Sequence, residues 1–347
     1  MPFCATFVVN KKGVFFMHEQ LNINFSHTLC SRICIGRVSE QLPMLLSQGT
    51  RVIAIADRNV SEVCTALGLS EVLLVDASEE NKSLAVASEL LGQLVEMGAD
   101  RSTFLLGIGG GITTDLVGFV ASTYMRGVRF GLVPTTLLAQ VDAAIGGKCG
   151  VNFGGYKNMV GSFAPADFVV CDVELLHTLG HRELRSGMAE VVKTAIIGDA
   201  ELFALCEANT IESLAGNTAL FSEVVGRAAA VKCAIVQRDL LEGGERRSLN
   251  LGHTLAHAIE SLTHDYTHGE AVAVGLAYVA AKSLNEGLLA QEDYERIVAV
   301  LQRYDLPTST DLSECALAEA MGHDKKNHNG RVGWVFPTAI GHGVIYK

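Results

Sequence analysis

The sequence has 347 residues, a length that suits one large domain or two ordinary ones. Hydrophobic residues make up 49% and charged residues 19% of the chain, which excludes an intrinsically disordered protein. The formal net charge of −11 argues against general nucleic-acid binding, because nucleic-acid-binding surfaces are basic, and a small anionic ligand would need a local cluster of basic side chains.

The remaining composition argues against a membrane or secreted protein. The longest apolar run, residues 271–281, is shorter than the roughly 20 residues that span a bilayer. The first twenty residues lack the basic, apolar and small-residue pattern of a signal peptide. The nine cysteines form no CxxC pair, and their number is odd, which is typical of reduced thiols. We therefore expect a cytoplasmic protein with no membrane partner.

The first half of the sequence alternates short apolar strands with amphipathic helices. Strands are predicted at residues 51–57, 71–77, 102–110, 129–135 and 167–173, and helices at residues 82–99 and 114–123. These strands are almost continuously apolar, as in a parallel sheet that helices cover on both faces. The pattern predicts a doubly wound α/β domain.

After about Asp172 helical periodicity dominates the sequence, most clearly in residues 181–197, 219–239 and 276–288. This change predicts a second, mainly α-helical domain that ends in a short irregular or β tail at residues 330–347. We place the boundary after residue 173, which gives domains at 1–173 and 174–347.

A glycine cluster lies where the third predicted strand meets its helix, in "LLGIGGGITTDL" (105–116). Glycines let a backbone approach a phosphate closely, and the N-terminus of the next helix offers N–H groups. Ile112 stands where the usual GxGxxG pattern has its last glycine. Phosphate binding and a tight strand-to-helix turn both remain open. Asp57 is likewise either a ribose ligand or a helix cap.

Basic residues gather in the glycine-rich, loop-like segment 137–163 and recur along the second half. Lys193 follows Glu190 by three residues, so both lie on one helix face. Lys232 interrupts an apolar helical run, where an ammonium group needs a partner or a ligand. Any one of the other lysines is an ordinary surface residue when taken alone.

Four histidines occur in "LNLGHTLAHAIESLTHDYTHGEAV" (249–272). His253 and His257 are four residues apart and project from one helix face, so they can share a metal ion or a substrate. Buried histidines bonded to backbone are the alternative interpretation. His268 begins the next apolar helix, and Glu190, a carboxylate in the apolar context "GMAEVV", is a candidate third ligand.

Six blocks occur in an order and spacing that resemble the 3-dehydroquinate synthase family: "GGGITTDLVGFVASTYMRG", "VPTTLLAQVDAAIGGKCGVN", "YKNMVGSF", "ELRSGMAEVVKTAII", "LNLGHTLAHAIE" and "HGEAVAVG". The likeness extends from about Asp57 to Lys326. It implies a Rossmann-like dinucleotide-binding α/β domain at the N-terminus and a mainly α-helical domain that binds metal and substrate. It also implies NAD, a divalent metal (Zn²⁺ or Co²⁺) and a homodimer.

The resemblance also implies roles for individual residues. Glu190, His253 and His268 would be the metal ligands, and His257 would contact substrate and handle protons. The implied NAD contacts are Asp57, Asn59, Glu80, Lys82, Gly110, Gly111, Asp115, Thr135, Thr136, Asp142, Lys148, Lys157 and Thr178. The implied contacts to the anionic substrate are Lys148, Asn158, Lys193, Lys232, Arg246, Asn250 and Lys326 or its neighbour Lys325. The partner subunit's Arg126 would complete the site.

The implied reaction converts 3-deoxy-arabino-heptulosonate 7-phosphate to 3-dehydroquinate and phosphate. It proceeds by transient oxidation, phosphate elimination, re-reduction and intramolecular aldol closure, in the shikimate pathway to aromatic amino acids. Two enzyme alternatives remain: a sister sugar-phosphate cyclase that uses sedoheptulose 7-phosphate, and a metal-dependent polyol dehydrogenase. A non-enzymatic dinucleotide sensor would leave Lys232 and Glu190 in apolar surroundings without a reason.

Overall fold

The computed structural model describes residues 19–24, 30–322 and 333–346. The chain divides into two compact units, an N-terminal unit, Met1–His177, and a C-terminal unit, Thr178–Lys347. Among the described residues, no helix combines the length and the apolar character needed to cross a bilayer.

A seven-stranded sheet forms the centre of the N-terminal unit. Its order is β1-β2-β9-β6-β5-β3-β4, and all neighbours are parallel except β1 and β2. The strands are β1 (Glu19–Asn24), β2 (Cys30–Ile35), β3 (Val52–Asp57), β4 (Val72–Val75), β5 (Phe104–Gly109), β6 (Phe130–Pro134) and β9 (Phe168–Cys171). The five predicted strands are confirmed as β3, β4, β5, β6 and β9. The strands β1 and β2 were not predicted.

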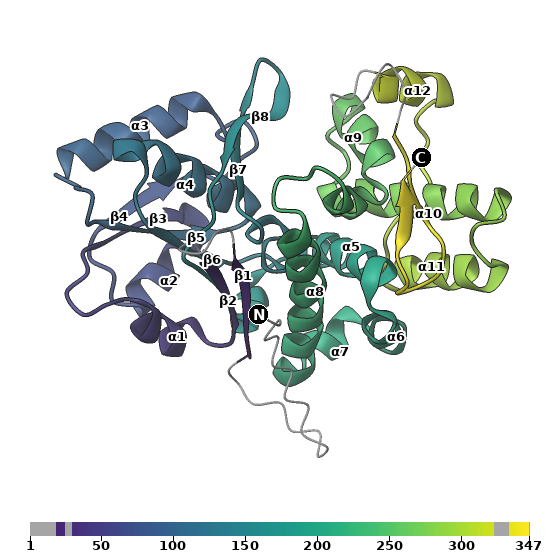
Figure 1. Ribbon diagram of the computed structural model, residues 1–347, viewed down its shortest axis with the longest axis horizontal. Helices are drawn as coiled ribbons and strands as arrows, with labels where there is room; N and C mark the ends of the chain where they lie inside the picture. The colour runs from purple at the N-terminus through teal and green to yellow at the C-terminus, as the bar shows by residue number, and fades with distance from the viewer. Residues whose placement is uncertain (1–18, 25–29, 323–332, 347) are drawn as a thin grey trace. The chain divides into compact units, whose positions relative to one another are not determined.

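Helices cover both faces of this sheet, as the apolar strands predicted. Helices α1 (Val38–Leu45) and α2 (Ser61–Ala66) lie on one face, and α3 (Leu84–Glu96) and α4 (Gly111–Thr123) lie on the other (Figure 1). Alternate residues of β5 separate the two layers. Leu106 packs in a buried cluster with Leu42 of α1, whereas a Cβ at Gly107 would lie only 3.1 Å from Val117 of α4. The predicted doubly wound α/β architecture is confirmed.

The glycine-rich segment 137–163 is not the loop that its composition suggested. It contains the π-helical turn η3 (Ala139–Ala143) and an antiparallel hairpin of β7 (Lys148–Phe153) and β8 (Tyr156–Phe163). Gly150 and Gly161 pair with one another in this hairpin, and the two backbones pack closely there. Glycines therefore stand at positions where the β-branched or aromatic residues typical of strands would have predicted a sheet. Short 3₁₀ turns complete the unit at η1 (Arg58–Val60), η2 (Tyr124–Arg126) and η4 (Val173–Thr178).

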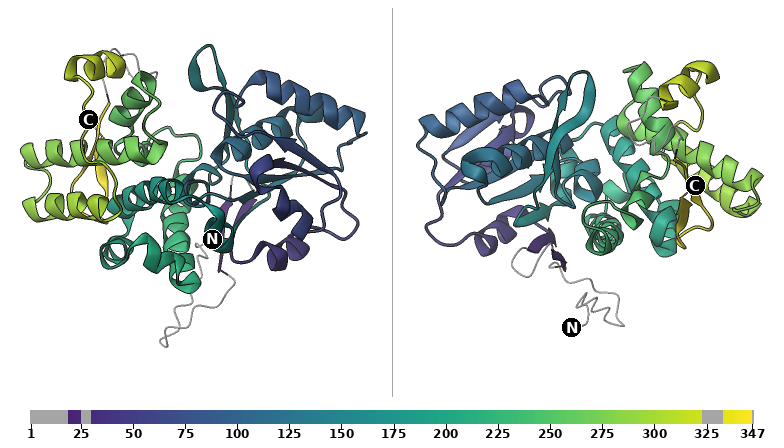
Figure 2. Two further views of the ribbon diagram at one scale, coloured as in Figure 1. Left: turned by 180° about the vertical axis from the view of Figure 1, so that it is seen from behind. Right: turned by 45° about the horizontal axis from the view of Figure 1, so that its top comes forward.

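The C-terminal unit is mainly helical, as predicted (Figure 2). Its elements are α5 (His181–Gly198), α6 (Ala200–Ala208), α7 (Ile211–Ala215), α8 (Thr218–Arg238), η5 (Glu245–Asn250), α9 (His253–Leu262), α10 (His268–Asn285), α11 (Gln291–Arg303), α12 (Glu314–Gly322), β10 (Val335–Pro337) and β11 (Val344–Tyr346). Most residues of α5 and α10 are buried, so these two helices form the core of the unit. The predicted β tail is the antiparallel pair β10 and β11.

Candidate functional site

Several predicted cofactor residues lie at the carboxyl ends of neighbouring strands in the sheet. Ala56 pairs with Ile108, and Gly109 pairs with Pro134, so these strands end side by side. Asp57 is the last residue of β3, and Gly110 and Thr135 come directly after β5 and β6. The strands β4 and β5 flank β3 on opposite sides, which makes this a point where strand order reverses. Ligands of open α/β sheets bind at such points, outside the carboxyl ends of the strands.

The glycine cluster forms the turn from β5 into α4. Gly110 is the extended N-cap residue, and α4 starts at Gly111, three residues before the predicted start. No side chain caps this helix, so its first N–H groups face outward with the positive end of the helix dipole. Asp57 acts as a cap itself: its Oδ1 accepts a hydrogen bond of 3.0 Å from the Asn59 N–H. The glycine cluster thus forms a tight strand-to-helix turn, and the uncapped N–H groups at the start of α4 can bind a phosphate.

Lys82, Asp115 and Asn158 are brought together from three separate segments of the N-terminal unit. The Lys82 side chain is 7% exposed, and its Nζ donates to Asp115 Oδ2 at 2.5 Å and to Asn158 Oδ1 at 2.6 Å. A buried ammonium with two oxygen partners is held in one orientation. Predicted cofactor and substrate residues therefore share one hydrogen-bonded cluster.

The other predicted residues of the N-terminal unit differ in exposure. Thr135 is buried and its N–H donates to the Gly109 carbonyl at 2.9 Å. Thr136 and Asp142 are half-buried, whereas exposed positions are taken by Asn59, Glu80, Arg126, Lys148 and Lys157. Arg126 has a positive φ of 68° at the end of η2.

In the C-terminal unit, three predicted ligands converge on one point. Glu190 Oε1 lies 3.1 Å from His268 Nε2 and 3.5 Å from His253 Nε2. One ligand atom from each residue lies within 4.8 Å of the others. The Glu190 carboxylate is fully buried, and its Oε2 forms an ion pair with Lys193 one turn along α5. Glu190 and Lys193 thus lie on one face of α5, as predicted, and form a buried ion pair there.

Close backbone packing sets the positions of these ligands. Gly269, next to His268, has no room for a side chain, because a Cβ there would overlap the Ser186 carbonyl oxygen of α5. The Gly269 N–H also donates to Ser186 Oγ at 3.0 Å. A Cβ at Gly275 of α10 would likewise lie 2.0 Å from the carbonyl oxygen of Gly252, which precedes His253. These small residues bring α5 and α9 close to α10 near the three ligands, where His253 and His268 begin their helices.

Outer contacts orient both histidines. His253 Nδ1 lies 3.1 Å from the Leu251 carbonyl oxygen, and His268 Nδ1 lies 3.5 Å from Glu260 Oε1. A ring whose Nδ1–H donates outward presents its Nε2 lone pair inward. Burial opposes protonation of His268, but the carboxylates of Glu190 and Glu260 outweigh it and raise the pKa of His268 to about 10. A proton or another cation is therefore favoured between these acceptors.

This donor set fits a divalent transition metal. Two imidazole nitrogens and one carboxylate oxygen are the ligand types of catalytic zinc sites, which leave one coordination position open for substrate or water. An inward lone pair on each Nε2 beside a carboxylate oxygen is repulsive unless a cation lies between them. The ring of His257 packs edge-on against His253 with centroids 5.6 Å apart, so His257 lies beside the cluster.

The predicted anion-binding residues of the C-terminal unit include Lys193 on α5, Lys232 on α8, and Arg246 and Asn250 in η5. Lys232 and Arg246 are buried. Arg246 donates to the Leu240 carbonyl oxygen at 2.6 Å, and Asn250 Nδ2 donates to Glu242 Oε1 at 3.0 Å. Thr178 is exposed at the end of η4. Lys325 and Lys326 lie outside the described residues.

Sequence reasoning missed several polar residues that support these clusters, namely Glu79, Asn152, Glu242 and Glu260. A signal existed for Glu260, because it follows His253 by seven residues, two helical turns along the same face of α9. No comparable spacing pointed to Asn152 or Glu79, which contact one another from positions 73 residues apart.

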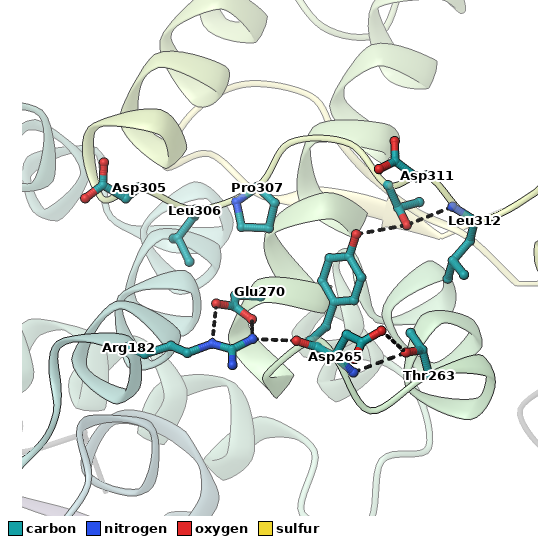
Figure 3. A pocket seen from close by; sticks show the side chains of 11 residues that line it. Arg182, Thr263, Asp265, Glu270, Asp305, Leu306, Pro307, Asp311 and Leu312 are labelled. Carbon is teal, nitrogen blue, oxygen red and sulfur yellow. Dashed lines mark hydrogen bonds and ion pairs between the residues drawn. The ribbon is translucent and has the colours of Figure 1, made fainter.

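A separate cavity of about 600 Å³ lies in the C-terminal unit beside the start of α10 (Figure 3). Acidic and apolar side chains line it, and its arginine, Arg182, forms a two-pronged ion pair with Glu270 at 2.8 and 2.7 Å. Arg182 also donates to the Asp265 carbonyl oxygen at 2.5 Å. No predicted site residue lines this cavity. The Arg182–Glu270 pair instead links α5 to α10 next to the metal-ligand cluster.

Comparison with known proteins gives a consistent result over most of the chain. Residues 72–186 match the model described as "3-dehydroquinate synthase N-terminal", and residues 187–327 match "3-dehydroquinate synthase C-terminal". The 3-dehydroquinate synthase of Desulforamulus reducens is 42% identical over 277 residues, which cover 79% of this chain and 77% of that protein. The enzyme of the same name from Pyrococcus abyssi is 44% identical over 270 residues, covering 78% and 79%.

Among solved structures, 2-epi-5-epi-valiolone synthase from Streptomyces hygroscopicus subsp. jinggangensis 5008 is similar over 94% of both chains, with a TM-score of 0.84 and 27% identity. That protein was solved with NAD⁺ and Zn²⁺ bound. The two matched family models together span residues 72–327, and the curated relatives are about as long as this chain. The chain therefore belongs to the 3-dehydroquinate synthase family.

Proposed function

We propose that this chain catalyses the 3-dehydroquinate synthase reaction, converting 3-deoxy-arabino-heptulosonate 7-phosphate to 3-dehydroquinate and inorganic phosphate. The observation that carries this proposal is the convergence of Glu190, His253 and His268 in a chain 42% identical to a curated enzyme of that name. The net reaction is a carbon–oxygen lyase step with no net oxidation, in the shikimate pathway of aromatic amino acid biosynthesis.

We assign the NAD-binding role to residues 1–173 and the metal- and substrate-binding role to residues 174–347. The carboxyl ends of the strands near Asp57 and the uncapped N-terminus of α4 support the assignment of NAD binding to residues 1–173. In this proposal Gly110 and Gly111 approach the pyrophosphate. The other contacts assigned to NAD are Asp57, Asn59, Glu80, Lys82, Asp115, Thr135, Thr136, Asp142, Lys148, Lys157 and Thr178.

Glu190, His253 and His268 would hold Zn²⁺ or Co²⁺, with Glu260 and the Leu251 carbonyl as the outer contacts that orient the two rings. When bound, the metal supplies a Lewis acid for the substrate's secondary hydroxyl, and NAD supplies a hydride acceptor for the carbon that bears it. The ring of His257 packs against that of the ligand His253, and His257 is not one of the three residues whose ligand atoms converge. We therefore assign proton transfer to His257 rather than metal binding.

The substrate carries a phosphate at one end and a carboxylate at the other. An acidic chain must gather basic groups locally to bind it, because its net charge of −11 repels anions at long range. We assign these anion contacts to Lys148, Asn158, Lys193, Lys232, Arg246, Asn250 and Lys326. A homodimer, in which the partner subunit's Arg126 reaches the site, and a cytoplasmic location complete the proposal.

The main alternative is a sister cyclase that accepts sedoheptulose 7-phosphate, which lacks the substrate's carboxylate. Lys232, Arg246 and Asn250 all match the pattern of the 3-dehydroquinate synthase family, which favours the carboxylate-bearing substrate. A polyol dehydrogenase would need fewer anion-binding residues and would accumulate NADH.

The test presents both sugar phosphates, in parallel, to purified Zn²⁺-loaded protein with NAD, and follows released phosphate and the mass of the organic product. The proposal requires one phosphate per 3-dehydroquinate from the heptulosonate. Turnover of sedoheptulose 7-phosphate alone would assign the chain to a sister activity, and no phosphate from either substrate would exclude the cyclase reaction.

A further inference from the structure

Asn152, at the end of β7, connects the hairpin to the loop that precedes α3. Its backbone N–H donates to the Lys82 carbonyl oxygen at 2.8 Å. Its side-chain Nδ2 donates to Glu79 Oε1 at 2.7 Å and to the Glu79 carbonyl oxygen at 3.1 Å. Three hydrogen bonds from one residue thus fix β7 to the segment that carries Glu80 and Lys82.

The remaining side-chain atom of Asn152 acts on the opposite strand of the hairpin. Asn152 Oδ1 accepts the backbone N–H of Asn158 at 2.9 Å. Asn158 has a φ of 52°, in the left-handed region that residues other than glycine seldom adopt, so this contact stabilises a conformation that costs free energy. In that conformation Asn158 Oδ1 lies 2.6 Å from Lys82 Nζ.

We propose that Asn152 is a positioning residue that couples the cofactor-binding loop to the substrate-binding hairpin. This inference rests on the proposed function, in which Lys82 contacts NAD and Asn158 contacts the substrate. Asn152 touches neither ligand in this proposal. It holds the Lys82 backbone and the Asn158 backbone at the distance where their side chains bond, so both residues are preorganised together.

The coupling has a thermodynamic consequence. A ligand that immobilises Lys82 also immobilises Asn158. The second ligand then no longer bears the conformational-entropy cost of ordering the residue that it contacts. NAD and substrate should then raise each other's affinity, typically by about five- to 150-fold for coupled sites, and by the same factor in both directions. Removal of the Asn152 side chain should bring this factor close to one.

The experiment measures Kd for NAD by calorimetry on the full-length protein, with and without an unreactive phosphonate analogue of the heptulosonate. We expect Asn152→Ala to bring the coupling factor close to one, to weaken the binding of both NAD and the analogue, and to raise KM for the heptulosonate. Asn152→Asp keeps the acceptor for Asn158 but sets a carboxylate against Glu79, so it should also lose the coupling.

A reversed hydrogen bond provides the control for folding. In the double variant Asn152→Asp with Glu79→Gln, the glutamine amide can donate to the new carboxylate. Part of the coupling should return, because the Glu79 carbonyl oxygen still faces that carboxylate. Glu79→Gln alone keeps an acceptor for Asn152 Nδ2 and should resemble the wild type. A purely structural role of Asn152 would lower Tm without changing the coupling factor in the folded fraction.

Failures of the two proposals are distinguishable. A wild type that binds both ligands and turns over the heptulosonate, with an unchanged coupling factor in Asn152→Ala and Asn152→Asp, overturns the positioning role alone. A double variant that stays as defective as Asn152→Asp overturns it as well. A wild type that binds neither NAD nor the analogue overturns the proposed function and this inference with it.

Discussion

His268 Nε2 lies 3.1 Å from Glu190 Oε1, although the two residues are 78 positions apart in the chain and belong to different helices. The contact depends on the backbone packing of Gly269 against Ser186, next to the imidazole. The geometry of the ligand cluster is thus a consequence of how closely α5 and α10 approach.

Gly269→Ala should separate these helices, because a Cβ at this position has no space beside the Ser186 carbonyl. Overpacking of this kind costs about 1–3 kcal/mol of the free energy of unfolding. We expect a lower Tm and a loss of bound metal, measured by calorimetry and by elemental analysis. Gly92→Ala is the control, since nothing lies near a Cβ there and alanine favours a helix. Full metal content in Gly269→Ala would show that this packing does not position the ligands.

His253→Ala and His268→Ala should each remove metal and activity together, because two protein ligands hold a divalent metal far more weakly than three. His257→Ala should retain the metal but slow turnover, as expected for a residue that only transfers protons. The measurement is metal content per chain alongside kcat. If His253→Ala and His268→Ala kept the wild-type metal content, the ligand assignment would be wrong.

Glu260→Gln should weaken metal binding by about tenfold, the lower end of the range for outer contacts of metal-bound histidines. The amide oxygen can still accept from His268 Nδ1, but the negative charge that makes the ring a stronger ligand is lost. Competition with a zinc chelator gives the affinity. Glu314→Gln, at an exposed position of α12, is the matched control. Equal affinities in both variants would remove Glu260 from the site.

Acid should reduce the stability that the Arg182–Glu270 ion pair gives to the start of α10. The Arg182 guanidinium lowers the pKa of Glu270 below its ordinary value of 4.5. A carboxyl group with a depressed pKa stabilises the folded state above its unfolded pKa, and this stability disappears as pH falls through the folded pKa. The wild type should therefore exceed Glu270→Gln in free energy of unfolding at pH 6–7. Urea titrations at several pH values should show this difference shrinking below about pH 4.5. A difference that stayed constant with pH would contradict the ionic role of Glu270.

The sequence predicted those elements whose signals are local. The strands β3, β5 and β6 were found because residues buried on both faces give unbroken apolar runs. The hairpin of β7 and β8 was missed because glycines occupy positions where its two backbones pack closely. The strands β1 and β2 were not predicted, and β1, at the edge of the sheet, carries alternating polar residues.

The site shows the same division. His253 and Glu190 stood out because of local spacing and an unusual apolar context. The bonds of Lys82 to Asp115 and Asn158 join residues 33 and 76 positions apart, and only the folded chain brings them together. Glu260 was missed because a glutamate near a helix end usually faces solvent, whereas here its side chain is only 11% exposed.

The most direct test of the central claim is the number of phosphates released for each NAD present. Purified Zn²⁺-loaded protein, stripped of nucleotide, receives a tenth of an equivalent of NAD and an excess of 3-deoxy-arabino-heptulosonate 7-phosphate. A cyclase that returns its hydride within each turnover releases many phosphates per NAD, forms 3-dehydroquinate and builds up no NADH absorbance. Phosphate or oxidised product that stops at one equivalent per NAD, with NADH accumulating, would contradict the account and identify a dehydrogenase.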